Sequence, residues 1–518
     1  MLRQLFTPLL LAFLLITNLC HSLTTNAQSV AWQKNMGGTQ DDIATHIEPT
    51  ADGGYIFIAT VSSNDMDVVG GLQAHHGGKD IWVVKTNSAN AVQWKRCLGG
   101  TADDVAASIL LANGGGYLIT GATNSTNGDV SGNHGNSDLW VVKLSDLGAI
   151  DWQRCYGGAG NETTSGYSSA TATIDNNIAM IGDTDMPNSG DIGNGNGGAW
   201  AIKINASNGN IIWGKLIGGS WGDDGFAIAQ APDGSFVAVG RGSSPDIPTA
   251  NPPTAYGQTD IIVSKINSTG TTVDWAKMLG GSDAYDGGHG VSVAPDGTIY
   301  VVGNVMSTDG NCTDKHGVVW ESDAFAAALS PTGTILWTNC IGGNGNFDVF
   351  IGATTDATGN LIATGWVNGG GGDVSNFIGY EDAWLVAIDK TTGAVMTEKT
   401  YGGTGQDRFY HARRSAANYY IAGFSSSSDG DLTGNNGLLD AWLLTVGCSL
   451  TVNITGNNTP CANTNATYSV AAGPTGATYI WSINGGTVAS GCGNTDNTCT
   501  VNWGNAGAGS VSVTQSNP

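Results

Sequence analysis

Carboxylates that could bind a cation recur in segments of the sequence that are rich in Gly, Ser and Asn. These segments include SNDMDVVGG, NGDVSG, SGDIG, GGDVS and SSDGDLTG, and their acidic residues are Asp65, Asp67, Asp129, Asp191, Asp373, Asp429 and Asp431. Asp carboxylates, with Asn and backbone carbonyl oxygens, are suitable ligands for Ca²⁺. No segment holds the full D-x-D-x-D-G calcium pattern, and Asp also caps turns by accepting hydrogen bonds from nearby amides. Calcium binding and turn capping therefore both stay open.

Aromatic side chains in loop segments offer a second chemistry, the stacking of an aromatic ring on a ligand. The candidates are Trp221, Tyr256, Tyr285, Trp320 and Phe347. Each could equally pack within its own loop, because an amphipathic ring is often half-buried without any ligand. We therefore treat these five residues as candidate ligand contacts for a glycan or a protein.

Signatures of catalysis are scarce. His75, His76, His134 and His316 lie in loop segments without metal-ligand spacing, and we expect them to be solvated. A sialidase needs a cluster of Arg for its substrate carboxylate, and residues 28–518 contain only six Arg. The sequence also lacks a vicinal Cys pair, HExxH, GxSxG and a phosphate loop. A hydrolase or lyase that uses loop carboxylates is the alternative to a binding protein.

The overall charge narrows the class of partner. The 518 residues carry a net charge of −24 with only 19 Lys and Arg. A nucleic-acid-binding protein needs a basic stripe, and an anionic membrane attracts basic segments, so neither partner is expected. The start, MLRQLFTPLLLAFLLITNLC, is a short basic segment followed by an apolar run. It is typical of a secretory signal peptide over residues 1–27, and no later stretch is apolar enough for a transmembrane segment.

An internal sequence repeat covers most of the chain, and the structure that it forms must position the candidate Asp and aromatic residues. A Gly-Gly pair begins at residues 37, 99, 157, 218, 280, 342 and 402, at spacings of 58 to 62 residues. Trp stands five residues before six of these pairs, and an acidic turn follows each pair. Each unit ends in a D-x-W strand or a blurred version of it, such as Asp80-Ile81-Trp82 or Asp138-Leu139-Trp140. Such a period is the signature of a repeat architecture.

Each unit predicts four short strands and no helix. Strands such as IWVVK and AWLLTV are apolar on consecutive residues, so both faces of each sheet must be buried. Stacked four-stranded sheets around an axis satisfy this requirement and predict a seven-bladed β-propeller over residues 28–447. The N-terminal strand at 30–36 lacks a preceding partner, and the strand at 440–446 lacks a following one. We therefore expect the first of these strands to complete the last blade, which removes the exposed edges, and we expect a monomeric propeller.

This topology separates two faces. The Gly-Gly turns and the long loops before D-x-W lie on one face, which we call the long-loop face, and the short turns such as ADGG and PDG lie on the other. Binding residues tend to lie on long loops held by a rigid scaffold, so function is expected on the long-loop face. The regularly spaced Trp residues are expected to pack between blades.

The repeat resembles the SBBP-type bacterial β-propeller repeat, and LGGSDAYDGGHGVSVAPDGTIYVVGN at 279–304 is the segment most similar to it. The resemblance covers roughly residues 30–447. It implies the propeller fold and says almost nothing of function, since the family shares no active site.

Residues 448–518 differ in character and predict a small β-sandwich. Their short alternating segments surround Tyr479-Ile480-Trp481, which resembles the core of a PKD-like, immunoglobulin-like domain. The Gly-Asp-Gly common in that family is replaced here by Ser482-Ile483-Asn484-Gly485-Gly486. A propeller followed by such a domain is similar to bacterial surface proteins exported by type IX secretion. These usually end in a sorting domain, which is not evident here.

Export permits disulfides. Cys312 and Cys340 belong to the long loop and the outer strand of the fifth blade, so we expect them to be joined. Cys492 with Cys499 could close a hairpin, and Cys448 with Cys461 is a further candidate pair. Cys97 and Cys155 are expected not to pair with each other. The sequence thus predicts a secreted or outer-surface bacterial protein that binds an extracellular glycan or protein, with Ca²⁺ as its candidate cofactor. A structural surface-layer module is a further alternative.

Overall fold

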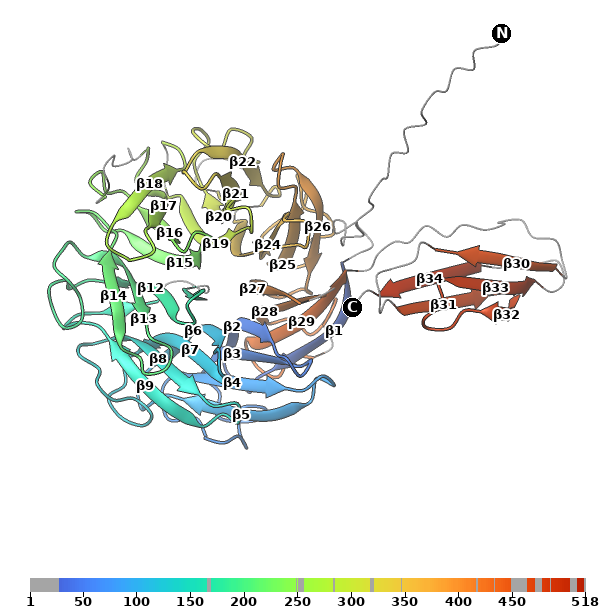
Figure 1. Ribbon diagram of the computed structural model, residues 1–518, viewed down its shortest axis with the longest axis horizontal. Coiled ribbons are helices and arrows are strands. Elements are labelled where there is room, and N and C mark those ends of the chain that lie inside the picture. Colours follow the sequence, from blue (N-terminus) through green and yellow to red (C-terminus); the bar gives the residue numbers. More distant parts are fainter. Residues whose placement is uncertain are drawn as a thin grey trace, which may run out of the picture. The chain divides into compact units, whose positions relative to one another are not determined.

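The computed structural model describes residues 28–164, 169–247, 249, 256–282, 285–316, 321–345, 347–415, 418–432, 434–448, 464–470, 478–484, 486–503 and 510–516. All regular elements in these ranges are β-strands (Figure 1). The chain divides into a larger compact unit, Ser22–Ser449, and a smaller one that contains Leu450–Pro518. Among the described residues there is no helix with the length and hydropathy needed to cross a membrane.

The larger unit is a β-propeller whose seven antiparallel sheets follow one another around a ring (Figure 1). In chain order the strands are β2 (Asp42–Pro49), β3 (Tyr55–Val61), β4 (Asp80–Thr86) and β5 (Val92–Leu98) in blade 1; β6 (Asp104–Leu111), β7 (Tyr117–Thr123), β8 (Asp138–Leu144) and β9 (Ile150–Tyr156) in blade 2; β10 (Glu162–Thr163), β11 (Ala170–Ala172), β12 (Ile178–Thr184), β13 (Gly198–Ile204) and β14 (Ile211–Leu216) in blade 3; β15 (Asp224–Gln230), β16 (Phe236–Gly242), β17 (Asp260–Ile266) and β18 (Val273–Leu279) in blade 4; β19 (Gly287–Val293), β20 (Ile299–Val305), β21 (Asp323–Leu329) and β22 (Ile335–Ile341) in blade 5; β23 (Val349–Thr355), β24 (Leu361–Val367), β25 (Asp382–Ile388) and β26 (Val395–Tyr401) in blade 6; and β27 (Asp407–Ser415), β28 (Asn418–Ser425), β29 (Asp440–Cys448) and β1 (Gln28–Met36) in blade 7.

The first strand of the propeller closes the ring. β1 pairs antiparallel with β29, from Gln28 opposite Cys448 to Met36 opposite Ala441. Blade 7 therefore combines β27, β28 and β29 from one end of the propeller with β1 from the other, which Figure 1 shows in orange and blue. The predicted seven-bladed propeller, with its last blade completed by the N-terminal strand, is confirmed.

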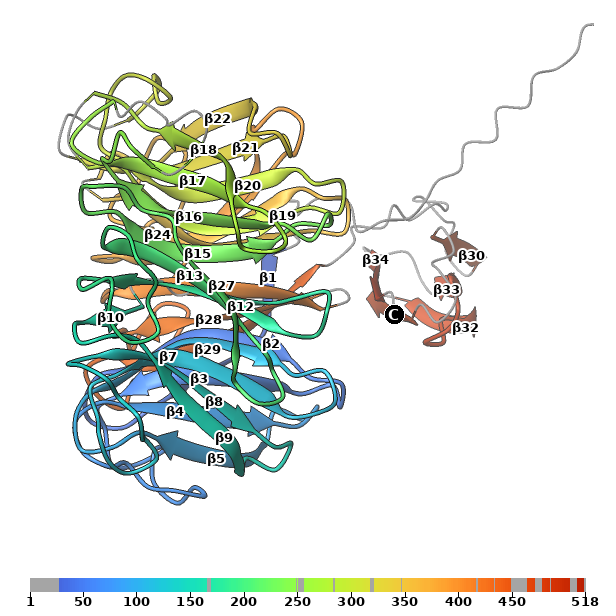
Figure 2. The same cartoon turned by 60° about the vertical axis from the view of Figure 1, so that its left-hand side comes forward.

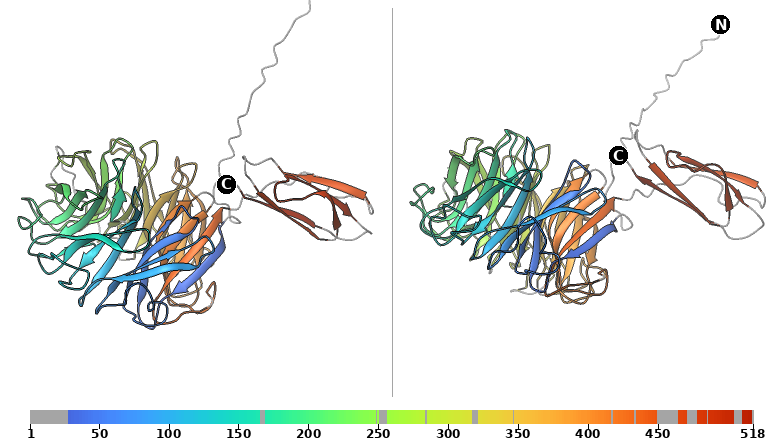
Figure 3. Two further views of the ribbon diagram at one scale, coloured as in Figure 1. Left: turned by 60° about the horizontal axis from the view of Figure 1, so that its bottom comes forward. Right: turned by 90° about the horizontal axis from the view of Figure 1, so that it is seen from below.

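The sheets are buried on both faces because they stack on each other around the ring (Figures 2 and 3). All seven residues of β4 are buried, as are all seven of β25. The clusters of buried residues span neighbouring blades, and one cluster joins Ile58 of blade 1 to Trp140 of blade 2. Packing between blades thus explains why the central strands are apolar on consecutive residues.

In blades 1 to 5 the recurrent Trp of the outer strand packs on a short turn of the next blade. The Trp94 ring packs against Gly148 so closely that a Cβ added to Gly148 would lie 2.9 Å from the ring. The indole N–H of Trp94 donates a hydrogen bond to the carbonyl of Asp146 at 3.0 Å. Gly148 has φ of +80°, a conformation that favours glycine. The same arrangement joins Trp337 to Gly393. The regular Trp residues are therefore packing residues between blades, as the spacing predicted.

The smaller unit is built from two sheets. One contains β30 (Thr464–Ser469), β33 (Thr498–Trp503) and β32 (Gly486–Gly491), and the other pairs β31 (Thr478–Asn484) with β34 (Ser510–Ser516). Its core includes Tyr468, Tyr479 and Val501, with Trp481 packed against them. Segment 450–456, one of the short alternating segments expected to form strands, lies outside the described residues. β32 was not expected, because its Gly486 and Ser490 are typical of a turn.

Candidate functional site

A buried acidic side chain holds each Gly-Gly turn on the long-loop face. Its carboxylate accepts a hydrogen bond from the backbone N–H of the second Gly, at the point where one blade ends and the inner strand of the next begins. The accepting residues are Asp42, Asp104, Glu162, Asp223, Asp286, Asp348 and Asp407, at 2.6–2.9 Å. The acidic turn of the repeat is thus a structural anchor at every junction between blades.

A second buried carboxylate, the Asp of D-x-W, faces the same Gly-Gly turn from the preceding blade. One of its oxygens accepts a backbone N–H from the long loop at 2.5–3.1 Å. These residues are Asp80, Asp138, Asp260, Asp323, Asp382 and Asp440. The other oxygen is buried without a hydrogen-bond partner in Asp80, Asp138, Asp260, Asp323 and Asp440. A Cβ on Gly99 would lie 2.5 Å from an oxygen of Asp104 and 2.9 Å from one of Asp80.

The two carboxylates of a junction therefore lie on either side of one glycine. Burial, together with the charge of Asp286, raises the pKa of Asp260 to about 6. Burial raises the pKa values of Asp348, Asp382 and Asp440 to about 6 as well. In blade 3, Gly198 stands where the other blades have this Asp. We call each pair of facing carboxylates a junction pair.

The residues predicted as calcium ligands mostly tie the long loops to these turns. Asp65 accepts hydrogen bonds from the amide and hydroxyl of Thr39 at 2.9 and 2.8 Å. Asp429 does the same for Thr404, whose amide lies at 2.8 Å. An oxygen of Asp431 accepts the N–H of Gly402 at 3.2 Å. These contacts are those of turn capping, the alternative that the sequence left open.

The other four predicted ligands are spread over different blades. The backbone N–H of Asp67 donates to Gly37, and Asp373 accepts from Gly342 at 3.3 Å. Asp129 forms an ion pair with Arg96 at 3.4 Å. Asp191 lines a cavity of about 490 Å³ between blades 2 and 3. Within the described ranges the structure brings no three of the seven predicted Asp side chains together as a metal site.

Of the loop histidines that were expected to be solvated, His134 and His316 are exposed and His76 is half-buried. Each of these three also contacts a buried carboxylate, which was not expected. Nδ1 of His76 lies 2.7 Å from the buried carboxylate of Asp80, and Nδ1 of His134 lies 2.6 Å from that of Asp138. His316 makes the same contact with Asp323 at 3.0 Å. The signal in the sequence was the spacing His-Gly-x-x-Asp before two of the D-x-W strands, which was not recognised. These histidines anchor their loops to the junction pairs.

The described loop aromatics are exposed, and all lie on the long-loop face. The exposed fraction is 59% for Trp221, 55% for Tyr256, 50% for Tyr285 and 47% for Phe347. Trp320 lies outside the described residues. Tyr285 and Phe347 occupy the same position in successive units, since each forms a parallel bridge to the residue before a D-x-W Asp or its equivalent. Tyr380, 62% exposed in the long loop of blade 6, is a further aromatic that the sequence analysis missed.

The inner strands enclose a cavity of about 330 Å³ around the axis, which we call the axial cavity. Its wall is formed by the halves of the inner strands that lead into the short turns, away from the long-loop face. Most of the wall is apolar or uncharged, but blades 1 and 7 contribute His46, Glu48, His411 and Arg413. The sequence analysis did not single out these residues, because they belong to different ends of the propeller sequence.

These four side chains form one cluster at the ring-closing junction. The rings of His46 and His411 stack with centroids 3.6 Å apart. Nε of Arg413 lies 3.1 Å from Oε2 of Glu48, and Nε2 of His46 lies 3.6 Å from Oε1 of Glu48. Burial, then the charge of Arg413, lowers the pKa of His46 to about 3. Burial raises the pKa of Glu48, against the opposing effect of Arg413.

Comparison with known proteins identifies only the C-terminal unit. Residues 449–518 match the model of the PKD-like domain family. No curated protein matches the chain.

Among solved structures, the chain is similar to BamB from Moraxella catarrhalis, with 13% identity over 80% of this chain and 99% of that one, at a TM-score of 0.36. It is also similar to quinohemoprotein alcohol dehydrogenase from Comamonas testosteroni, with 11% identity over 85% and 79% and a TM-score of 0.42. A protein of unknown function from Dyadobacter fermentans gives 8% identity over 81% and 99% and a TM-score of 0.40. These identities and TM-scores are too low to support any inference about activity.

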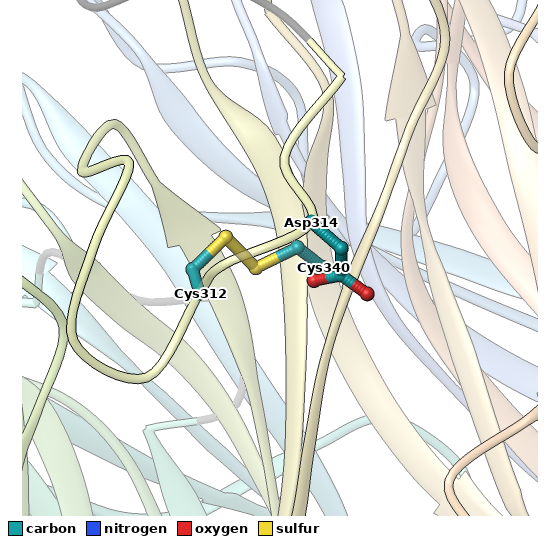
Figure 4. A group of neighbouring side chains, drawn as sticks. All are labelled: Cys312, Asp314 and Cys340. Atoms are coloured by element: carbon teal, nitrogen blue, oxygen red, sulfur yellow. A yellow bond between two sulfur atoms is a disulfide. The ribbon is translucent and has the colours of Figure 1, made fainter.

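The cysteines follow the expected pairing where the structure describes them. Cys312 in the long loop of blade 5 is bonded to Cys340 of β22 (Figure 4). Cys492 is bonded to Cys499. Asp314 lies beside the first bridge. A disulfide sulfur is not a thiolate, the form that binds metal ions, so this group is no metal site. Cys97 and Cys155 are free and buried, and Cys461, the expected partner of Cys448, lies outside the described residues.

Proposed function

We propose that the protein is a secreted or cell-surface binding protein that holds an extracellular glycan or protein on the long-loop face of its propeller. The exposed aromatic residues carry this proposal. Trp221, Tyr256, Tyr285, Phe347 and Tyr380 are all about half exposed or more, and all lie on loops of that face in blades 3 to 6 or at their junctions. Large aromatic side chains that a protein leaves in water are typical of ligand and partner contacts.

Export is part of the proposal. It is supported by the apolar start at residues 1–27, by the two disulfides and by the PKD-like match. Similarity of the repeat to SBBP-type surface proteins points in the same direction. A catalytic role in polysaccharide cleavage has less support, because the junction pairs with raised pKa values are fully buried beneath the Gly-Gly turns. A sugar ring could not reach them without moving those turns.

The test is a glycan array and a protein pull-down with the mature full-length chain. We expect Tyr285→Ala and Phe347→Ala each to weaken a detected interaction about tenfold, as expected for a residue worth about 1.4 kcal/mol. Leu147→Ala is the matched control, because Leu147 is 79% exposed in a short turn on the opposite face. Binding that is unchanged by both aromatic variants, or that is lost with Leu147→Ala, would move the site away from the long-loop face.

A further inference from the structure

Blades 1 and 2 carry the same three polar side chains where each blade meets the next at the outer rim. A His of the long loop contacts the Asp of D-x-W, and an Arg of the outer strand donates through Nη1 to a turn carbonyl of the next blade at 3.2 Å. The third is an Asp of the next blade, whose backbone N–H donates to the first Gly of a Gly-Gly pair at 2.9 Å. The residues are His76, Arg96 and Asp129 at blade 1, and His134, Arg154 and Asp191 at blade 2. The two sites can therefore be compared residue by residue.

The site at blade 1 is filled by the side chain of Gln73. Its Oε1 accepts a hydrogen bond from Nη2 of Arg96, and its amide nitrogen lies 2.6 Å from Nε2 of His76. Because an amide nitrogen can only donate, Nε2 of His76 must accept. That tautomer agrees with the contact of Nδ1 of His76 with the carboxylate of Asp80 at 2.7 Å. One carboxamide group thus binds an Arg and a His at the same time.

Blade 2 has no residue equivalent to Gln73. Its long loop, from the first loop Asp to the Asp of D-x-W, covers residues 129–138, which is four residues fewer than the equivalent segment 67–80 of blade 1. The place that Gln73 fills in blade 1 is a cavity of about 490 Å³ in blade 2, which we call the rim pocket. A Cβ added to Gly132, which lines the rim pocket, would meet no atom within 4 Å.

The polar side chains of the rim pocket are left with free hydrogen-bonding atoms. Within the part of the chain that the structure describes, Nη2 of Arg154 and Nε2 of His134 have no hydrogen-bond partner, and neither residue pairs with Asp191. Nδ1 of His134 lies 2.6 Å from the carboxylate of Asp138, which holds the proton on that nitrogen and leaves Nε2 as an acceptor. The rim pocket therefore offers the same donor and acceptor that Gln73 occupies in blade 1.

We propose that the rim pocket binds the acetamido group of an N-acetylated sugar. The carbonyl oxygen of that group accepts a hydrogen bond from Nη2 of Arg154, and its N–H donates to Nε2 of His134. The volume of the pocket lies in the range of small-molecule sites, so it has room for a sugar ring as well as the amide. Ser131 and Asp191 are exposed on its wall, where they can bind the hydroxyl groups of that ring.

The proposal rests on the proposed function for the choice of a glycan as the source of the amide. It does not rest on the exposed aromatic residues, because the rim pocket lies between blades 2 and 3 and none of those residues lines it. The two sites can therefore be tested separately.

The experiment measures binding of N-acetylglucosamine to the mature full-length chain by saturation-transfer NMR. We expect the strongest transfer at the acetyl methyl group. Glucosamine and glucose lack the amide and should bind at least about tenfold more weakly, because Arg154 and His134 then lose their partners. Equal binding of glucosamine and N-acetylglucosamine would overturn the proposal. Tighter binding of glucuronic acid would overturn the amide, and tighter binding of glutamine would overturn the sugar.

Variants locate the binding. Arg154→Ala should weaken it at least about tenfold. Arg96→Ala is the matched control and should bind as the parent does, because Arg96 makes the same contact with the next blade but its Nη2 is already bound to Gln73. A second variant keeps Arg154 and His134: insertion of Gly-Gly-Leu-Gln after Ser131 gives blade 2 the loop of blade 1 and should abolish binding. Equal losses in Arg154→Ala and Arg96→Ala, or full binding by the insertion variant, would overturn the proposal.

Tyr285→Ala separates this result from the proposed function. It should leave the binding of N-acetylglucosamine unchanged, because Tyr285 does not line the rim pocket. If the unmodified chain binds a glycan that depends on Tyr285 and Phe347 but does not bind N-acetylglucosamine, the proposed function stands and the rim pocket proposal is overturned.

Discussion

The long-loop end of the blades and the wall of the axial cavity differ in how their buried charged residues are distributed around the ring. At the long-loop end, six junctions carry the same pair of acidic residues around a Gly-Gly turn, and one oxygen of most pairs has no partner. In the cavity, one junction carries two His, a Glu and an Arg, and the equivalent positions elsewhere are small or uncharged. A feature repeated at nearly every junction belongs to the scaffold. A feature present at a single junction is the better candidate for a function of this particular protein.

Deleting residues 28–36 should break the closing junction and give the largest effect. β1 contributes ladder hydrogen bonds along β29, worth roughly 4 kcal/mol at about 1 kcal/mol for each of four bonds. Burial of Trp32, which packs on Tyr55, adds roughly 2–3 kcal/mol. Urea and thermal unfolding measure the loss. A variant that melts within about 2 °C of the parent would show that closure does not stabilise the ring.

A methyl group between the carboxylates of one junction should have the next largest effect. Gly99→Ala places a Cβ 2.5 Å from Asp104 and 2.9 Å from Asp80, at a φ of +156°. We expect a loss of roughly 2–4 kcal/mol in the free energy of unfolding. Gly222→Ala is the control, because nothing lies within 4 Å of its added Cβ. Equal stability of both variants would contradict the tight packing of the junction.

Raising the pH should weaken the scaffold junctions. Because the pKa of Asp260 is about 6 in the folded protein and its ordinary value is 3.8, its stabilising contribution is complete below about pH 4 and is lost as the pH rises through 6. The propeller should therefore be more stable at pH 5 than at pH 8. A shift of this size corresponds to roughly 1–3 kcal/mol for one carboxyl. Thermal melts across this range provide the measurement.

The variant Asp260→Asn tests the same junction directly. It should raise the melting temperature at pH 8 and change it little at pH 5, because it removes the charge that faces Asp286. Asp233→Asn is the opposite control: burial raises the pKa of Asp233, but the hydrogen bonds from Lys265 and Ser235 and the charge of Lys265 together lower it to about 2. That variant should bring no gain at pH 8. If the melting temperature of the unmodified protein instead rises steadily from pH 5 to 8, ionisation of the junction pairs does not destabilise the propeller.

Calcium should give the smallest effect. The long-loop face is rich in Asp, so millimolar Ca²⁺ is expected to raise the melting temperature slightly more than Na⁺ at matched ionic strength. An ion at about five times its Kd would add about 1 kcal/mol. Replacing Asp429 and Asp431 by Asn should reduce the difference if SSDGDLTG is a site. Identical melting curves in the two salts would assign these Asp residues to turn capping alone.

The fold was predictable because the same motifs recur in each repeat unit. Gly-Gly, Trp and D-x-W recur at fixed spacing, and strands such as IWVVK can only be buried on both faces. The closing strand followed from the unpaired strand at each end. Interruption of the inner strand of blade 3 into β10 and β11 did not follow, because only tertiary pairing with β12 shows it.

The candidate site was only partly predictable. The exposed aromatics stand out because they fall off the repeat pattern. His46 and His411 could not be recognised as a pair, because 365 residues separate them in sequence and only closure of the ring brings them into contact. His46 and His411 are the residues that directly follow the β-bulge of their inner strands. Comparing this position across all units would have revealed both histidines, but a bulge is not visible in a sequence.

The offset between β1 and the rest of blade 7 has a consequence for how such a ring can change its size. Each unit of the sequence begins with the strand that completes the preceding sheet, and its other three strands begin the next one. A gene that gains or loses one whole unit therefore still encodes a chain with one unpaired strand at each end. These two terminal strands can still pair with each other. Gain or loss of a unit therefore changes the number of blades but not the way in which the ring closes.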